Sequence, residues 1–144
     1  RTEIEGIRDY FESILENVTL IDDFDVYGHL DYVVRYCPSG EKIFRMSDYK
    51  EVFEQIFKEI IPKGKGIEIN TGSLYKNMSY AHPHMDILKL YKDMGGEIIT
   101  VGSDAHKPEY LCYDFETYAR DALTSLGYRY YCTFKNRKPE FNPL

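Results

Sequence analysis

The clearest chemical signal in this chain lies between Ile98 and His106, where a β-branched run ends at Gly102 and is followed directly by Asp104 and His106. A carboxylate and an imidazole at the carboxyl end of a buried strand suit a divalent metal ion, and α/β enzymes place their chemistry there. In an extended chain both side chains would leave the same face and converge on one ion. The alternative is that Ser103 and Asp104 cap a turn and leave His106 on the surface. We take Asp104 and His106 as candidate catalytic and metal-binding residues.

A second candidate metal ligand is His29, which follows Gly28 at the end of a short apolar run. Neutral imidazole is the commonest protein ligand for zinc and similar metals. An equally weighted alternative is a half-buried histidine that ends a strand. Asp31 could orient an imidazole from behind, although capping a turn is the favoured role for this residue.

Glu68 is a carboxylate inside a predicted strand, flanked by Ile67 and Ile69. Because side chains alternate along a strand, it points away from the layer that its neighbours fill. It would face either the interior of a barrel or solvent at an edge strand. We favour the interior, where the carboxylate must be paired or bound to metal, because burying it unpaired costs several kcal/mol.

Arg35 and Lys76 each lie a few residues beyond a predicted strand end, where they could hold a phosphate. A single cation in such a position is more often a solvated charge. His82 and His84 flank Pro83 and could offer two ligands. Proline keeps the residue before it extended and favours a helix start, so loop and N-cap roles are favoured for the two histidines.

Composition and the absence of other motifs exclude several functional classes. The net charge of -6 argues against nucleic acid as a partner. No apolar run approaches the roughly 20 residues that span a bilayer, and no signal peptide is visible. Three widely spaced cysteines indicate reduced, mostly packed thiols in a cytoplasmic protein. The sequence has no nucleophile elbow, P-loop or dinucleotide-binding glycine motif, which leaves metal-assisted hydrolysis as the favoured reaction class.

Helices and strands alternate along the predicted chain. Helices are expected at 2–17, from Ser47 or Asp48 to near Pro62, at 84–94 and at 114–126; strands at 24–28, 66–70, 97–102 and 128–134; loops at 37–46 and 71–83; and a polar tail follows the last strand. Asp48 and Glu51 fit a capping box for the second helix. The alternation predicts an α/β fold with a parallel sheet, as a barrel or an open doubly wound sheet, in a single unit over residues 1–144.

Four segments of this sequence resemble the polymerase-and-histidinol-phosphatase (PHP) family, and specifically its histidinol-phosphatase branch. They are Gly28-His29-Leu30-Asp31 with Arg35-Tyr36, Glu68-Ile69-Asn70-Thr71, Gly102-Ser103-Asp104-Ala105-His106-Lys107-Pro108, and Thr133 to Pro139. The resemblance implies the C-terminal part of a distorted (β/α)7 barrel that holds up to three divalent metal ions, such as zinc, manganese or iron.

The resemblance also implies roles for individual residues. His29, Asp104 and His106 match metal ligands, Glu68 matches a residue that lines the pocket, and Arg35 falls where the branch binds the substrate phosphate. Lys76 stands near a basic position after the Glu-Ile-Asn motif. The implied reaction is hydrolysis of L-histidinol phosphate, a small phosphorylated substrate, in histidine biosynthesis.

The chain departs from the family by lacking its opening His-x-His motif and further ligands that precede the middle motif. We therefore expect a C-terminal portion with about half of the ligand set, inactive by itself. Two alternatives stay open. One is a phosphoesterase of the same family with another substrate. The other is a non-catalytic truncated domain, which could form a homo-oligomer through its open sheet edge.

Overall fold

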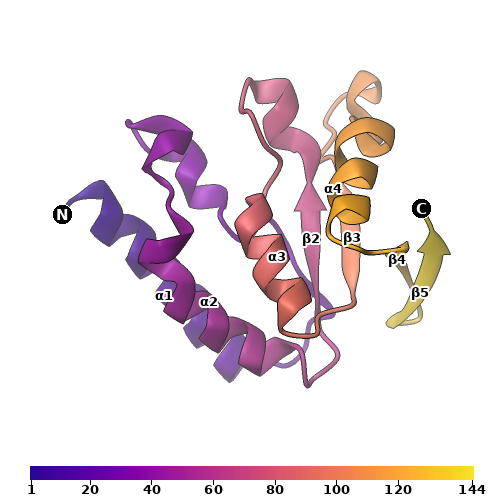
Figure 1. Cartoon of the computed structure of the whole chain (residues 1–144), viewed down its shortest axis with the longest axis horizontal. Helices are drawn as coiled ribbons and strands as arrows, with labels where there is room; N and C mark the ends of the chain where they lie inside the picture. Colours follow the sequence, from indigo (N-terminus) through magenta and orange to yellow (C-terminus); the bar gives the residue numbers. More distant parts are fainter.

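The computed structural model describes residues 1–144 and is built on a parallel sheet of three strands in the order β1-β2-β3. The strands are β1 (Val26–Tyr27), β2 (Gly66–Asn70) and β3 (Ile99–Gly102). Tyr27 pairs with Ile67, and Asn70 pairs with Gly102. Because the strands are parallel, the segments that follow them all leave from one edge of the sheet, the upper end of β2 and β3 in Figure 1.

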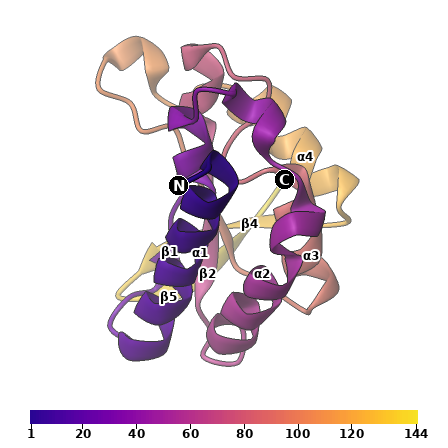
Figure 2. The same ribbon diagram turned by 90° about the vertical axis from the view of Figure 1, so that its left-hand side faces the viewer.

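Helices cover one face of this sheet. They are α1 (Glu3–Leu20), α2 (Met46–Ile60), α3 (Met85–Asp93) and the shorter α4 (Arg120–Ser125). Figure 2 shows α1 and α2 side by side in front of the strands, with the C-terminal hairpin behind them. None of the helices has the length and apolar character needed to cross a membrane.

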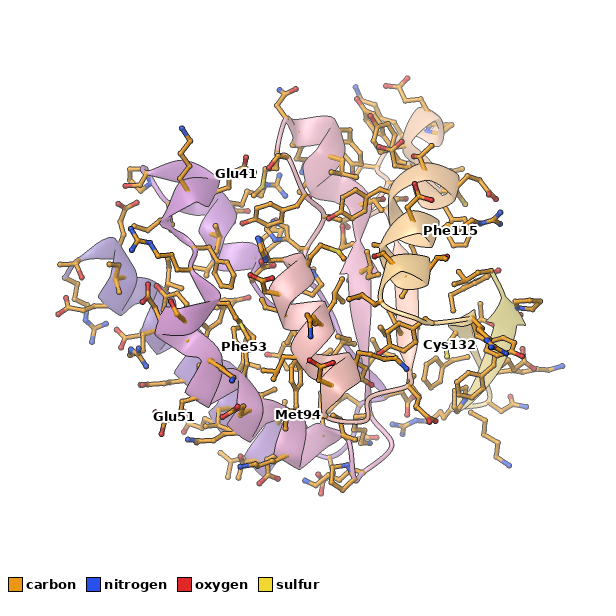
Figure 3. All side chains as sticks on the ribbon, in the orientation of Figure 1. Glu41, Glu51, Phe53, Met94, Phe115 and Cys132 are labelled. Carbon is orange, nitrogen blue, oxygen red and sulfur yellow. The ribbon has the colours of Figure 1, made fainter.

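The core lies between the helices and the sheet. Ile67 and Ile69 of β2 are fully buried, and so are Phe11 of α1 and Phe53 of α2, whose ring centroids lie 4.6 Å apart. Figure 3 shows Phe53 on the side of α2 that faces the other elements, whereas Glu51 projects outward. Burying a phenylalanine side chain contributes about 1.5–3 kcal/mol, so these rings hold the helix pair on the sheet.

Short helical turns lie between the main elements, two of them in the segments predicted as loops and one, a π-helical turn, within the helix predicted at 114–126. These are 3₁₀ helices at Tyr32–Tyr36, Gly40–Ile43, Thr71–Lys76 and Pro108–Tyr110, and a π-helical turn at Phe115–Ala119 that leads into α4. The first and third follow β1 and β2 closely. They therefore stand at the carboxyl edge of the sheet, where the candidate site residues were expected.

The predicted capping box of the second helix is wrong. Helix α2 begins at Met46, after an extended Arg45, and no side chain caps it. Asp48 instead sits in the first helical turn, where a carboxylate favours the positive end of the helix dipole. A capping box does occur at the start of α1, where Thr2 and Glu5 bond reciprocally.

The prediction of a fourth parallel strand and a polar tail is also wrong. Strand β4 (Tyr130–Lys135) pairs antiparallel with β5 (Lys138–Pro143), so the expected tail is a strand of a separate hairpin. The two residues between them, Asn136 and Arg137, have φ of 50° and 62°. Two consecutive left-handed residues form the turn that best matches the twist of paired strands.

Ion pairs connect the turn of this hairpin to the segment that precedes β1. The Arg137 guanidinium donates to Asp25, with Nε 3.0 Å from Oδ2, and to Asp23, with Nη1 2.6 Å from Oδ1. Both aspartates precede β1. The last quarter of the chain is thereby tied to its first quarter at the end of the sheet opposite the candidate site.

Candidate functional site

The structure gathers the predicted metal ligands and Glu68 near the carboxyl edge of the sheet. His29 is the second residue after β1, Glu68 lies within β2, and Asp104 and His106 follow β3. Since β1 and β3 both pair with β2, the three segments are neighbours.

The Glu68 carboxylate lies across the glycines of both flanking strands. A Cβ added to Gly28 would come 3.0 Å from Oε2 of Glu68, and one added to Gly102 would overlap Oε1. The two isoleucines beside Glu68 are fully buried, whereas Glu68 is half-buried, as the alternation predicts. Its one hydrogen bond is a 3.4 Å contact from Nδ2 of Asn70, so the carboxylate keeps acceptor capacity for a ligand.

His29 presents a buried nitrogen with no protein partner. Its Nδ1 atom is buried and makes no hydrogen bond, and its ring lies on Tyr32 with centroids 4.5 Å apart. The backbone of His29 is in the left-handed region, with φ of 31°, so the chain turns sharply directly after β1. An orphaned buried imidazole nitrogen fits a metal ligand, because buried polar atoms are otherwise almost always hydrogen-bonded.

Asp104 and His106 do not adopt the extended geometry that the sequence predicts. Asp104 has φ of 50°, and the chain turns back so that Nδ1 of His106 lies 2.8 Å from the Asp104 carbonyl oxygen. A carbonyl only accepts, so we assign the proton to Nδ1, which leaves the Nε2 lone pair of His106 available. Both side chains are exposed, and the Asp104 carboxylate has no partner in the chain.

The two cations predicted to bind phosphate lie on aromatic rings beside this edge. The Arg35 guanidinium stands 5.2 Å from the ring centroid of Tyr32 and donates to its hydroxyl oxygen at 3.3 Å. The Lys76 ammonium lies 5.9 Å from the ring centroid of Tyr75. Neither cation forms an ion pair with a carboxylate, so both charges are free to meet an anion.

Electrostatics link Arg35 to Asp104 through two tyrosines. The pKa of Tyr32 is raised, first by its hydrogen bond with the Tyr36 hydroxyl and then by burial; the Asp104 charge adds to the rise, and Arg35 opposes it. Burial raises the pKa of Tyr75, and the charges of Asp104 and Arg35 again act in opposite directions. Both tyrosines therefore lie within electrostatic reach of the predicted ligand and of the predicted phosphate-binding cation.

Asp31 does not cap the turn, so the capping role favoured from the sequence is wrong. It holds an imidazole, which was the alternative role. Its fully buried carboxylate lies 2.6 Å from Nδ1 of His82 and accepts the backbone N–H of His84 at 2.9 Å. His84 caps α3 as predicted, because its Nδ1 accepts the N–H of Asp86 at 3.1 Å. The buried pair was not predicted, since His82 was expected to have a loop role.

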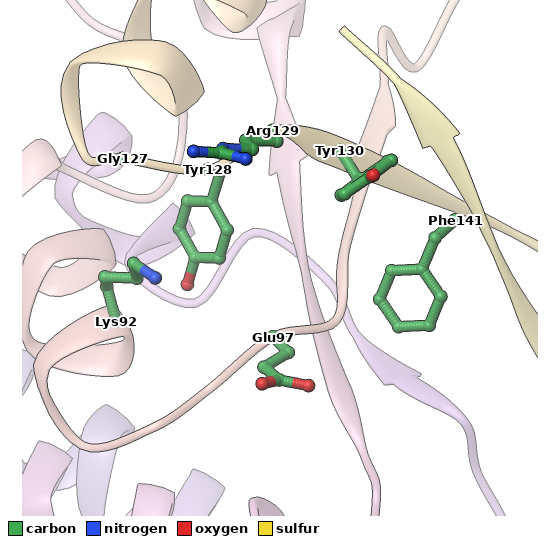
Figure 4. Close-up of a pocket in the computed structure, with 7 residues that line it drawn as sticks. All are labelled: Lys92, Glu97, Gly127, Tyr128, Arg129, Tyr130 and Phe141. Atoms are coloured by element: carbon green, nitrogen blue, oxygen red, sulfur yellow. The ribbon is translucent and has the colours of Figure 1, made fainter.

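A hollow of about 350 Å³ lies elsewhere in the molecule (Figure 4). It is lined by Lys92, Glu97, Gly127, Tyr128, Arg129, Tyr130 and Phe141. Glu97 precedes β3, whereas Asp104 follows it, so the hollow lies at the opposite end of that strand. It does not contain any of the predicted site residues.

The donors at the carboxyl edge have the right chemistry for a divalent metal ion, since zinc, manganese and iron accept mixed imidazole and carboxylate ligands. The orphaned Nδ1 of His29 supports this assignment. No three His, Cys, Asp or Glu side chains of the chain lie close enough together to hold an ion. These residues therefore fit part of a metal shell.

Comparison with known proteins gives consistent matches. The PHP domain model matches residues 1–72. The histidinol-phosphatase of Lactococcus lactis subsp. lactis (strain IL1403) is 31% identical over 140 residues, which are 96% of this chain and 51% of that protein. A probable histidinol-phosphatase of Thermotoga maritima is 32% identical over 126 residues, covering 88% of this chain and 51% of the relative.

A solved structure matches the fold as well. The crystal structure of histidinol phosphate phosphatase from Lactococcus lactis, complexed with zinc, L-histidinol and phosphate, superimposes with a TM-score of 0.79 at 30% identity. The match covers 97% of this chain and 52% of that one. The chain thus spans about half the length of the relatives that it matches.

Proposed function

The chain belongs to the PHP family, since the PHP domain model matches half of it, and on this premise we propose that it supplies part of the active site of a metal-dependent histidinol-phosphatase. The observation that carries the proposal is the set of donors at the carboxyl edge of the sheet. The orphaned Nδ1 of His29, the open carboxylates of Glu68 and Asp104, and the free Nε2 of His106 belong to three adjacent strand ends.

His29, Asp104 and His106 would each contribute a ligand to a site for divalent metal ions, as part of its shell, with Glu68 lining the pocket beside them. A bound metal ion supplies a Lewis acid that neutralises phosphoryl oxygens and lowers the pKa of a bound water. The Nδ1–H of His106 stays bonded to the Asp104 carbonyl, which keeps Nε2 in the ligand role. The donor set suits zinc, manganese or iron, and the Lactococcus structure contains zinc.

Arg35 and Lys76 are proposed to bind the phosphate of the substrate. Arg35 is held on Tyr32, the residue whose ring also contacts His29, so its guanidinium stands beside the proposed metal ligands. A guanidinium offers two parallel donors to phosphoryl oxygens and stabilises charge that develops in the transition state. Lys76, above the Tyr75 ring, would add a second positive charge at the rim.

The proposal extends to the fold and the location of the protein. We propose that the three parallel strands form the C-terminal part of a distorted (β/α)7 barrel, whose other strands supply the remaining ligands. The three cysteines are unpaired in the structure. Free thiols are typical of a reducing compartment, which supports a cytoplasmic location.

The test is a phosphate-release assay with L-histidinol phosphate and several other phosphomonoesters. The 144-residue chain is assayed alone and mixed with a polypeptide comprising the half of the Lactococcus enzyme that it does not match. We expect little turnover from the chain alone and zinc- or manganese-dependent release from the mixture, fastest with L-histidinol phosphate.

A matched pair of variants controls this assay. Asp104→Asn removes a proposed ligand and should abolish release, whereas Asp121→Asn changes an exposed carboxylate of α4 and should leave release unchanged. Equal release from the wild-type and Asp104→Asn mixtures would contradict the proposed site. Faster hydrolysis of another monoester would replace the proposed substrate and leave the reaction class standing.

A further inference from the structure

Tyr75 bridges the segments that follow two neighbouring strands. It lies in the 3₁₀ helix Thr71–Lys76 after β2, and its hydroxyl oxygen stands 2.8 Å from the carbonyl oxygen of Ser103 and 2.9 Å from that of Asp104, both after β3. The single hydroxyl proton is shared between these two acceptors. No other side chain of the chain donates to the Ser103 carbonyl.

The Asp104 carbonyl receives two donors that come from different parts of the chain. One is the Tyr75 hydroxyl, and the other is Nδ1–H of His106 at 2.8 Å. Asp104 occupies the left-handed region, with φ of 50°, which glycine adopts routinely and aspartate only occasionally. Such a backbone persists when its surroundings fix it, and the tyrosine is the donor that reaches it from another segment.

The side chain of Tyr75 is itself held in place. Its ring stacks on Tyr110 with centroids 4.0 Å apart and an interplanar angle of 10°, and Tyr113 meets its edge at 5.3 Å. Gly72 permits the close approach of the two segments, because a Cβ there would lie 3.1 Å from the Ser103 carbonyl oxygen and 3.3 Å from the Tyr75 hydroxyl. The hydroxyl is therefore fixed before any ligand arrives.

We propose that Tyr75 is a positioning residue that orients His106 for metal binding by holding the Asp104 carbonyl to which the imidazole donates. With that carbonyl fixed, His106 keeps its proton on Nδ1 and presents Nε2 to the proposed metal ion. The metal role rests on the proposed function, but the effect on the imidazole does not. Partners that orient a ligating histidine typically contribute 10–100-fold to metal affinity. Tyr75 does not touch the imidazole and acts through one further hydrogen bond, to the Asp104 carbonyl that accepts from His106.

The test is Tyr75→Phe, which keeps the stacked ring and removes the hydroxyl. The primary readout is the tautomer of His106 in the metal-free chain, measured from its imidazole ¹⁵N shifts. We expect the Nδ1–H tautomer in the wild type and a population shifted toward Nε2–H in Tyr75→Phe. Zinc affinity, measured by competition with a chelating dye, should fall roughly tenfold.

Tyr113→Phe is the matched control, because it removes a hydroxyl from the same cluster that has no partner in the structure, and it should change neither measurement. An unchanged tautomer in folded Tyr75→Phe overturns the proposal, whatever the zinc affinity. An Nε2–H tautomer for His106 in the wild type also overturns the proposal, and this measurement does not depend on how the variant folds. Failure of the phosphatase assay with these tautomer results intact would count against the proposed function alone.

Discussion

The buried carboxylate of Asp31 holds the imidazole of His82, with Oδ1 and Nδ1 2.6 Å apart across 51 residues of sequence. This pair ties the turn after β1 to the segment that leads into α3. Tyr32, adjacent to Asp31, contacts the rings of both His29 and His82, with centroid distances of 4.5 and 5.9 Å. The pair therefore supports the turn after β1, which carries the proposed metal ligand His29.

His82→Ala should destabilise the protein strongly, because it leaves the buried Asp31 carboxylate without its imidazole partner. Leaving a buried acceptor without its hydrogen-bond partner costs about 1–3 kcal/mol, and more when the acceptor is a carboxylate. The free energy of unfolding, measured by urea titration, should fall by that order. His84→Ala is the control, because it removes the side chain that caps the N-terminus of α3 and should cost about 1 kcal/mol. Equal losses for the two variants would show that the buried pair contributes nothing special.

The sequence predicted the parallel strands well, because their signals are local. Strand β2 was predicted with its exact bounds, since Gly66 and the alternation around Glu68 mark both its start and its face. Gly95 ends α3 as expected, with φ of 95°. The hairpin was missed because Asn136-Arg137 lacks the glycine that usually signals such a turn.

The candidate site could be predicted only where it depends on strand order. Parallel pairing places the segments after β1 and β3 on either side of β2, so His29, Asp104 and His106 could be proposed as ligands from residue type and position alone. The contact between Asp31 and His82 depends on how a loop packs, which no local pattern records. The left-handed backbone of Asp104 was missed for a related reason, since aspartate adopts that conformation only when its surroundings support it.

The effect of Gly102→Ala on the free energy of unfolding should depend on whether Glu68 is present. In the wild type the new methyl group displaces the Glu68 carboxylate, and we expect a cost of about 1 kcal/mol. In a Glu68→Ala background the space is open and the φ of residue 102 suits alanine, so the same change should stabilise by about 0.5 kcal/mol. Urea unfolding of the four proteins in this cycle measures the coupling.

Gly66→Ala provides the contrast for that cycle. Its Cβ would lie 2.7 Å from the backbone oxygen of Ile98, which cannot swing away as a carboxylate can. This variant should lose stability by about 2–3 kcal/mol whether or not Glu68 is present. Additive effects of Gly102→Ala and Glu68→Ala would contradict the placement of the carboxylate.

Arg137→Gln should lower stability at neutral pH and change the acid limb of the stability curve. The hydrogen bond from Arg137, and then its charge, lower the pKa of Asp23 below its ordinary value of 3.8. A lowered carboxyl pKa stabilises the folded state above the ordinary value, and this stabilisation is lost as the pH falls through the lowered one. The thermal midpoints of wild type and variant should therefore differ at pH 6 and converge below 3.8.

Two controls accompany the Arg137 measurement. Arg129→Gln removes an exposed charge with no carboxylate partner and should leave the pH dependence unchanged. Because Asp23 and Arg137 are exposed, 1 M salt should reduce the difference between wild type and Arg137→Gln at pH 6. A difference that persists unchanged below the ordinary aspartate range would mean that Arg137 acts through packing and not through charge.

Tyr91→Phe should weaken the fold modestly and make it less sensitive to alkali. The buried hydroxyl of Tyr91 donates to the Ile98 carbonyl at 3.1 Å, and its loss should cost about 1 kcal/mol near pH 7. Burial raises the pKa of Tyr91 to about 12.

A raised pKa stabilises the folded state below the ordinary value of 10.0, and this stabilisation is lost as the pH rises from there toward 12. The urea midpoints of the two proteins should converge over that interval, with tyrosinate absorbance at 295 nm reporting the ionisation. Tyr130→Phe, which changes a tyrosine 48% exposed on β4, should run parallel to the wild type across the same range. A constant gap between wild type and Tyr91→Phe up to pH 12 would show that Tyr91 ionises without penalty in the folded protein.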